Sequence, residues 1–186
     1  DRYRSKAAAL KRISKSNIPD KMNIMLNAAK APFWGLRVEA LNYLKAMEEI
    51  TDKNALKNVL LSTLQKDNKS AVRKSAVVLL AKIDKQEAIK TVRGVLLRDS
   101  SLAVLGAAMN SLKEIDTAQA LSIARELSTS KEIELRVSAA EIMGEFGSSQ
   151  DLPFLEKNIL GGEMKDYNRL RVLLAYAYHV IRNGSE

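Results

Sequence analysis

The stretch Val72-Arg73-Lys74-Ser75-Ala76-Val77-Val78-Leu79-Leu80 contains a short pattern that recurs along the chain. An apolar residue and an arginine are followed by an alanine three residues after the arginine, and by a large apolar residue four residues after the alanine. The other copies, the second of which has leucine in place of arginine, are Leu36-Arg37…Ala40…Leu44, Val104-Leu105…Ala108…Leu112 and Leu135-Arg136…Ala139…Met143. Successive copies are 36, 32 and 31 residues apart. A period in this range is typical of helical repeat arrays.

Weaker copies of the pattern extend it toward both ends of the chain. Leu170-Arg171…Leu174…Tyr178 follows 35 residues after the last full copy, and Ser5-Lys6…Ala9-Leu10…Ile13 precedes the first by 31 residues. The pattern therefore predicts an all-α fold, an α-α superhelix of stacked repeats, in which residues 1–186 form a single domain.

Apolar residues at spacings of three and four predict five helix pairs, preceded by one unpaired helix at residues 2–15. The predicted pairs are 20–30 with 32–47, 52–66 with 70–83, 84–98 with 102–115, 116–128 with 133–146, and 149–160 with 165–182. Aspartate or serine stands at nearly every helix start, and we expect Asp20 to cap the first paired helix. No segment alternates apolar and polar residues as a half-buried strand would.

Composition excludes several kinds of chemistry. The chain is 46% apolar and 28% charged, as in ordinary globular domains, and it has no cysteine. Disulfides, thiolate nucleophiles and cysteine zinc sites are therefore ruled out. We expect no membrane span, because no run approaches about 18 apolar residues. Nothing in the sequence assigns a compartment, and because the chain begins with Asp1 we expect a fragment or processed product of a larger protein.

The spacing of alanine and arginine recurs along the chain, which suggests structural roles for both. A small residue lets adjacent second helices of neighbouring repeats approach each other. Asp67 lies in the turn before Arg73, so we expect its carboxylate to pair with Arg73 and tie together the two helices of one repeat. We expect Arg37 and Arg136 to have the same structural role.

These features resemble HEAT-type repeats, in which aspartate in the turn and arginine early in the second helix recur. The segment Ala31-Pro32-Phe33-Trp34-Gly35-Leu36-Arg37-Val38-Glu39-Ala40 resembles a box in the C-terminal HEAT-like domain of bacterial zinc aminopeptidases of the aminopeptidase N family. Tyr3-Arg4…Ala9-Leu10 is similar to the helix that precedes that box. The resemblance implies a non-catalytic domain that closes over a catalytic domain and shapes the access of peptide substrates. It also implies a zinc ion in the parent's catalytic domain.

The chain itself lacks the residues for such catalysis. Zinc in that family is held by H-E-x-x-H on one helix, whereas this sequence has a single histidine, His179. We expect His179 to lie at the solvent or at the edge of the core and to bind no metal. Gly106-Ala107-Ala108-Met109-Asn110 shares letters with the family's substrate-amine motif but lacks its glutamate. We therefore predict no catalytic set and no cofactor in this chain.

Two other function classes stay open as alternatives. The formal net charge of +8 suggests nucleic-acid binding, but residues 1–30 hold eight basic against two acidic residues, which concentrates the excess charge at one end. The positions expected to line the concave surface do not form a basic ladder, so nucleic acid is the least favoured partner. A free-standing scaffold for protein–protein contact is the runner-up. As groove or partner contacts we predict Lys11, Arg12, Asn42, Asn110, Tyr176 and His179.

The N-terminal edge suggests where a partner would bind. Residues 2–15 match a second helix, yet no first helix precedes them in the sequence. A repeat cannot bury its apolar face alone. We therefore expect an upstream domain of the same polypeptide to dock on this edge, with acidic groups facing its cluster of lysines and arginines. Phe33 and Trp34 are expected to plug the joint between repeats, with an exposed anchor as the alternative.

Overall fold

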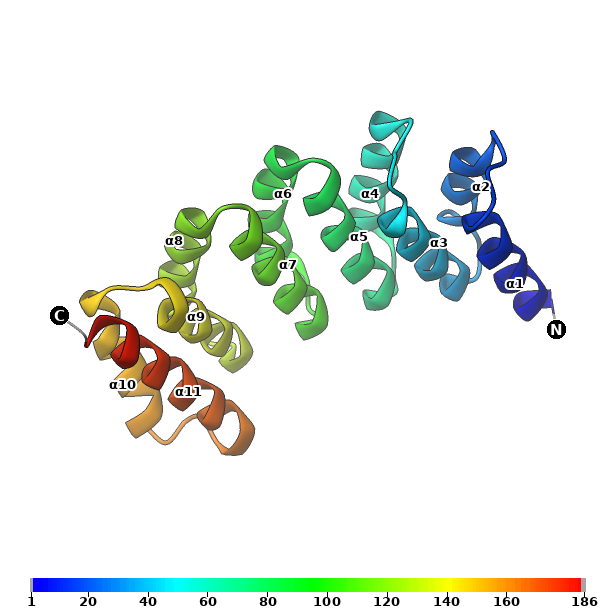
Figure 1. Ribbon diagram of the computed structural model, residues 1–186. Helices are drawn as coiled ribbons and strands as arrows, with labels where there is room; N and C mark the ends of the chain where they lie inside the picture. Colours follow the sequence, from blue (N-terminus) through cyan, green and yellow to red (C-terminus); the bar gives the residue numbers. More distant parts are fainter. Residues whose placement is uncertain (1, 185–186) are drawn as a thin grey trace. The chain divides into compact units, whose positions relative to one another are not determined.

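The computed structural model describes residues 2–184 and confirms an all-α helical repeat fold (Figure 1). These residues form eleven α-helices and one short 3₁₀ helix, η1. The bounds are α1 Arg2–Ser14, α2 Lys21–Ala28, α3 Trp34–Ala46, α4 Lys53–Lys66, α5 Ser70–Ile83, α6 Lys85–Arg98, α7 Leu102–Ile115, α8 Thr117–Leu127, α9 Ile133–Phe146, η1 Ser149–Asp151, α10 Leu152–Leu160 and α11 Asp166–Asn183. No helix within residues 2–184 is both long and apolar enough to cross a lipid bilayer.

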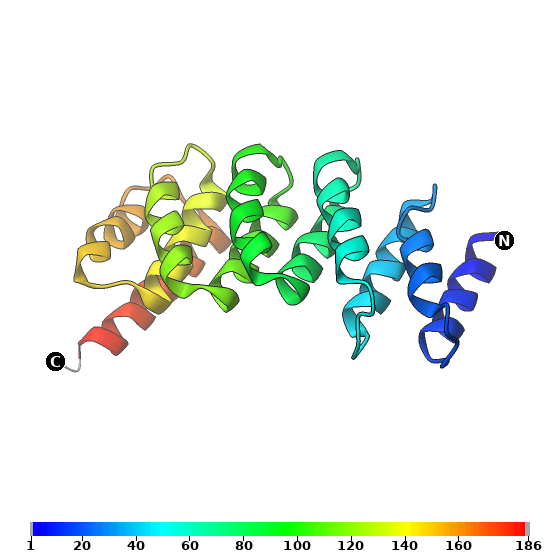
Figure 2. The same cartoon turned by 90° about the horizontal axis from the view of Figure 1, so that it is seen from above.

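The chain divides into two compact units, residues 1–108 and residues 109–186, with the boundary inside α7. In the first unit α2 packs on α3 and α4 on α5, while α1 packs on α3 and α3 on α5. In the second unit α8 packs on α9, α10 on α11, and α9 on α11. Figures 1 and 2 show the helices of each unit running back and forth in sequence order. Second helices of neighbouring repeats are thus in contact within each unit, as the repeat pattern predicts.

The alanines of the pattern lie in the core. All four are fully buried: Ala40, Ala76, Ala108 and Ala139. The large apolar residues four positions later are also buried: Leu44, Leu80, Leu112 and Met143. A larger side chain at an alanine position would have to displace atoms of a neighbouring helix, since protein interiors are close-packed.

Aspartates cap three of the first helices. The carboxylates of Asp52, Asp84 and Asp116 each accept a hydrogen bond from the backbone N–H three residues later, at 2.8, 3.0 and 2.9 Å. The cap expected at Asp20 is wrong, because its side chain makes no bond to the backbone of α2. The Asp20 carboxylate instead accepts a 2.7 Å hydrogen bond from the side-chain amide of Asn23.

The second unit has its closest helix approach at a glycine. A Cβ atom built on Gly144, in α9, would lie 2.5 Å from the carbonyl oxygen of Ala175, in α11. Only glycine lets the two backbones come this close. The sequence predicted close approach at the alanine of the pattern and did not single out Gly144.

Candidate partner-binding site

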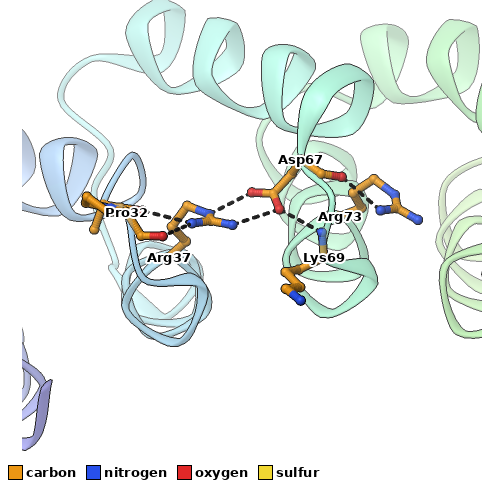
Figure 3. A network of polar contacts seen from close by, with 6 residues as sticks. Pro32, Arg37, Asp67, Lys69 and Arg73 are labelled. Carbon is orange, nitrogen blue, oxygen red and sulfur yellow. Dashed lines mark hydrogen bonds and ion pairs between the residues drawn. The ribbon is translucent and has the colours of Figure 1, made fainter.

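Two arginines of the first unit connect successive repeats, and Figure 3 shows the first of these links, from Arg37 to Asp67. Nε and Nη2 of Arg37 donate to the two carboxylate oxygens of Asp67 at 2.7 and 2.9 Å. Arg73 repeats this geometry on Asp99 at 2.6 and 2.8 Å, and its Nη1 donates to the backbone carbonyl of Asp67 at 2.8 Å. Each arginine therefore joins the turn of its own repeat to the turn of the next.

The expected pairing of Asp67 with Arg73 inside one repeat is wrong. The carboxylate of Asp67 also accepts the backbone N–H of Lys69 at 2.9 Å, and this bond orients it toward Arg37 of the preceding repeat. Arg73 is left with the carbonyl of Asp67 and with the carboxylate of Asp99. The structural role expected for these arginines therefore holds, but the bond ties neighbouring repeats together rather than the two helices of one repeat.

These bonds shift the pKa values of the aspartates. The hydrogen bonds from Arg73 hold the pKa of Asp99 below its usual value, although burial acts in the opposite direction. Burial acts to raise the pKa of Asp67, but hydrogen bonds from Arg37 and from the Lys69 N–H outweigh it, so this pKa is also lowered. Both carboxylates are therefore ionised at neutral pH.

The second unit uses related bonds. Arg125 donates to both carboxylate oxygens of the buried Asp151 at 2.9 Å. Arg136 donates to the backbone carbonyl of Ser130 at 2.8 Å, six residues earlier, as Arg73 does to Asp67. Its carboxylate partner is Glu163, at 2.7 Å, whose side chain is largely exposed. The arginine position is structural in this unit too.

The predicted contact residues differ in exposure. Lys11, Arg12 and Asn42 of the first unit and Asn110 of the second are exposed, and Tyr176 is half-buried. His179 is completely buried, so its expected place at the solvent or core edge is wrong. Its Nδ1 lies 3.2 Å from the carbonyl oxygen of Met143, because α11 packs closely on α9. A partner cannot reach this side chain without opening the helix pair.

Aromatic rings connect α1 with the start of α3, the second helix of the next repeat. The ring centroids of Tyr3, in α1, and Phe33, before α3, are 4.6 Å apart, and those of Phe33 and Trp34 are 5.9 Å apart. Both Phe33 and Trp34 nevertheless stay partly exposed. Phe33 contacts Tyr3 at the joint, but the rings of Phe33 and Trp34 are both exposed, so the plug and the exposed anchor both stay predictions.

An apolar pocket of about 310 Å³ opens at the N-terminal end of the first unit. We call it the N-terminal pocket, and it is lined by Lys6, Ala9, Leu10 and Ile13 of α1, Ile24 and Ala28 of α2, and Ala31 and Leu36. Lys6 is the one charged residue in this lining. The sequence predicted that residues 2–15 have an apolar side, but it did not predict the pocket. The pocket also needs Ile24 of α2, whose position relative to α1 depends on the angle between the two helices.

Exposed cations are frequent on α1, and one of them, Lys6, lines the N-terminal pocket. The basic side chains of α1 are all exposed: Arg2, Arg4, Lys6, Lys11 and Arg12. The first turn of α1 contains no acidic residue. Cations near a helix N-terminus oppose the helix dipole, so carboxylates supplied by a partner would be favourable there. Among residues 2–184 no group of three or more histidine, aspartate or glutamate side chains is arranged to hold a metal ion.

Comparison with known proteins identifies the repeat type. Residues 58–134 match the family of HEAT repeats. This segment contains two full copies of the pattern, at Arg73 and at Leu105. Searches of curated proteins and of solved structures returned no match to the chain. The family match and the paired helices together support a HEAT-like repeat domain.

Proposed function

We propose that this helical-repeat scaffold binds proteins, and that the N-terminal pocket receives the apolar face of an acidic amphipathic helix. The observation that carries the proposal is the combination of apolar walls with a lysine, Lys6, in the lining of the pocket, on a helix whose other cations are also exposed. Amphipathic helices bind such grooves through apolar residues spaced by three and four. Carboxylates flanking those residues would face Lys6 and Arg2, which lies one helical turn before Lys6 on the same face of α1.

The size of the pocket suits side chains rather than a whole buried helix. Its volume of about 310 Å³ lies at the lower end of ligand pockets. A docking helix would therefore lie across α1 and α2 and insert a few aliphatic side chains between Ala9 and Ala28. Small residues at these positions leave room for the larger side chains that the partner brings.

The resemblance to aminopeptidases suggests a finer identity for the partner. Ala31 and Leu36 of the Ala31–Ala40 box line the N-terminal pocket, and Phe33 of the same box contacts Tyr3. In this second candidate function, the occupant is a preceding domain of the same polypeptide, and the scaffold shapes access to that domain's zinc site. Sequencing the gene upstream of Asp1 tests this: an encoded H-E-x-x-H helix supports it, and an initiation codon directly before Asp1 refutes it.

Binding of a designed peptide tests the first proposal. The probe is a fluorescein-labelled helical peptide with leucines at positions i, i+3, i+4 and i+7 and glutamates on both flanks. Fluorescence anisotropy should show saturable binding that weakens with salt, because exposed charge pairs are screened. The same peptide with lysines on its flanks should bind at least about tenfold more weakly.

Two variants of the protein locate the binding surface. Arg2→Glu with Lys6→Glu should weaken binding of the acidic peptide at least about tenfold, because the two glutamates then repel it. The control Lys53→Glu with Lys74→Glu makes the same charge change at exposed positions of α4 and α5, and should bind normally. Equal weakening by both double variants would show a diffuse charge effect and refute docking at the pocket. Equal binding of a DNA duplex would favour the nucleic-acid alternative.

A further inference from the structure

Helix α11 carries a row of exposed apolar side chains along its length. We call it the α11 stripe; its members are Tyr167, Leu170, Leu174, Tyr178 and Ile181, each between 52% and 74% exposed. Exposed apolar patches of several hundred Å² are uncommon on monomeric proteins and mark interaction sites. The opposite face of α11 packs on α9 and contains the buried Val172 and His179.

The central residues of the stripe occupy positions that are buried in the copies of the pattern in α3, α5, α7 and α9. Leu170, Leu174 and Tyr178 correspond to Leu135, Ala139 and Met143 of α9, which are buried. In α9 these residues lie in the core of the second unit, whose main helix contact is between α9 and α11. Helix α11 therefore exposes a layer that a regular second helix buries.

Another repeat of the same type does not fit this layer. Leu174 replaces the alanine whose small size lets the next helix approach. Arg171 donates to Glu141 of α9 at 2.8 Å through both Nε and Nη2. It therefore turns back toward its own unit, whereas Arg37 and Arg73 reach forward to the next repeat. Within the described residues, Arg171 makes no forward link of the kind that Arg37 and Arg73 make.

We propose that the α11 stripe is the interface between two copies of this chain, with the two α11 helices antiparallel about a twofold axis at Leu174. The stripe is symmetric about this residue, since Tyr167 and Ile181 are seven residues from it and Leu170 and Tyr178 are four. A twofold axis places each residue against its symmetric counterpart, which makes the surface self-complementary.

The area of the stripe is sufficient for such a dimer. Large side chains bury about 150–250 Å² each when fully covered. At the exposures observed, the five residues offer roughly 600 Å² per copy, or about 1,200 Å² in total, above the ~1,000 Å² that a specific interface needs. Buried area does not by itself set affinity, so the Kd has to be measured.

Cysteine cross-linking tests the register directly, because the natural chain contains no cysteine. Leu174→Cys should form a disulfide dimer under mild oxidation, since the two copies of this position meet at the axis. Tyr167→Cys alone should not, because its two copies would be about 21 Å apart along the helices and a disulfide requires Cα atoms within about 7 Å. The double variant Tyr167→Cys with Ile181→Cys should cross-link, with peptide mapping showing residue 167 joined to residue 181.

Sedimentation equilibrium on the full chain provides the second test. The protein should be dimeric well above its Kd, and Leu174→Arg should weaken dimerisation at least about tenfold while leaving the circular dichroism spectrum unchanged. The control Leu160→Arg changes a leucine on α10 that is more exposed than Leu174, and this variant should remain dimeric. Monomeric protein at about 0.1 mM would overturn the proposed dimer. Self-cross-linking of every single-cysteine variant would also overturn it, because that result would indicate parallel rather than antiparallel helices.

Discussion

Removing Arg73 tests whether the arginine of the pattern stabilises the contact between successive repeats. The Arg73→Ala variant loses two hydrogen bonds to the carboxylate of Asp99 and one to the carbonyl of Asp67. The side chains of Arg73 and Asp99 are only 15% and 7% exposed. Without the arginine, the carboxylate of Asp99 still accepts one hydrogen bond, from the backbone N–H of Ser101.

The magnitude follows from the burial of this carboxylate. Breaking one side of a fully buried ion pair costs about 3–5 kcal/mol, because the remaining charge is left without compensation. Asp99 keeps the Ser101 N–H, and water can enter the space left by the arginine, so the cost is smaller. We expect Arg73→Ala to lower the free energy of unfolding by about 2–3 kcal/mol.

Urea denaturation followed by circular dichroism at 222 nm measures this loss. The control is Lys57→Ala, which removes a single 3.1 Å bond to Asp84, where the two side chains are 29% and 31% exposed. Such an exposed pair contributes about 0–1 kcal/mol. A double-mutant cycle of Arg73→Ala with Asp99→Ala isolates the pairwise energy. Equal losses for Arg73→Ala and Lys57→Ala would show that the bidentate pair is no stronger than an exposed one and would refute the reasoning.

Two further predictions concern packing and pH. Gly144→Ala should lower the free energy of unfolding by about 1–3 kcal/mol, since its Cβ would meet the backbone of α11. Gly94→Ala adds a Cβ in open space and should raise the free energy of unfolding by about 0.5–1 kcal/mol. Urea denaturation distinguishes the two variants, and equal effects would contradict the close approach at Gly144. Because the folded pKa of Asp99 is lowered, its pair contributes stability above the unfolded pKa of about 3.9 that is lost as pH falls through the folded value. Denaturation between pH 6 and 2.5 should therefore show a smaller acid loss in Arg73→Ala than in the natural protein, and identical losses would contradict this assignment.

The repeat period determined most of the fold in advance. The predicted ranges for α5, α7 and α9 coincide with the observed helices. Apolar periodicity identifies each helix, and aspartate or turn residues mark where it begins and ends. The error at Asp20 has a local cause. A nearby amide, that of Asn23, competes for the carboxylate, and sequence position alone does not show which donor wins.

Contacts between repeats were harder to predict than helices. Asp67 is six residues from Arg73 and 30 from Arg37, so proximity in sequence favoured the wrong partner. The choice depends on how repeats stack, which a single sequence does not specify. The burial of His179 has the same origin, since α9 and α11 approach at Gly144 and enclose the histidine beneath Met143. For the same reason the sequence predicted an apolar side on α1 but not the N-terminal pocket.

Helices α1 and α11, at the two ends of the repeat pattern, therefore present surfaces of opposite kinds. At α1 the pattern supplies small residues such as Ala9, next to a pocket and exposed cations, so a partner must bring both large apolar side chains and carboxylates. At α11 the alanine is replaced by Leu174, and Arg171 turns back to Glu141, so this helix supplies the large side chains itself. A pocket lined by small side chains needs larger side chains from a different molecule to fill it. A symmetric row of large apolar side chains can instead pack against the same row on a second copy of the chain. These differences follow from substitutions at two positions of one repeated pattern, and they are the reason for proposing a foreign partner at α1 and self-association at α11.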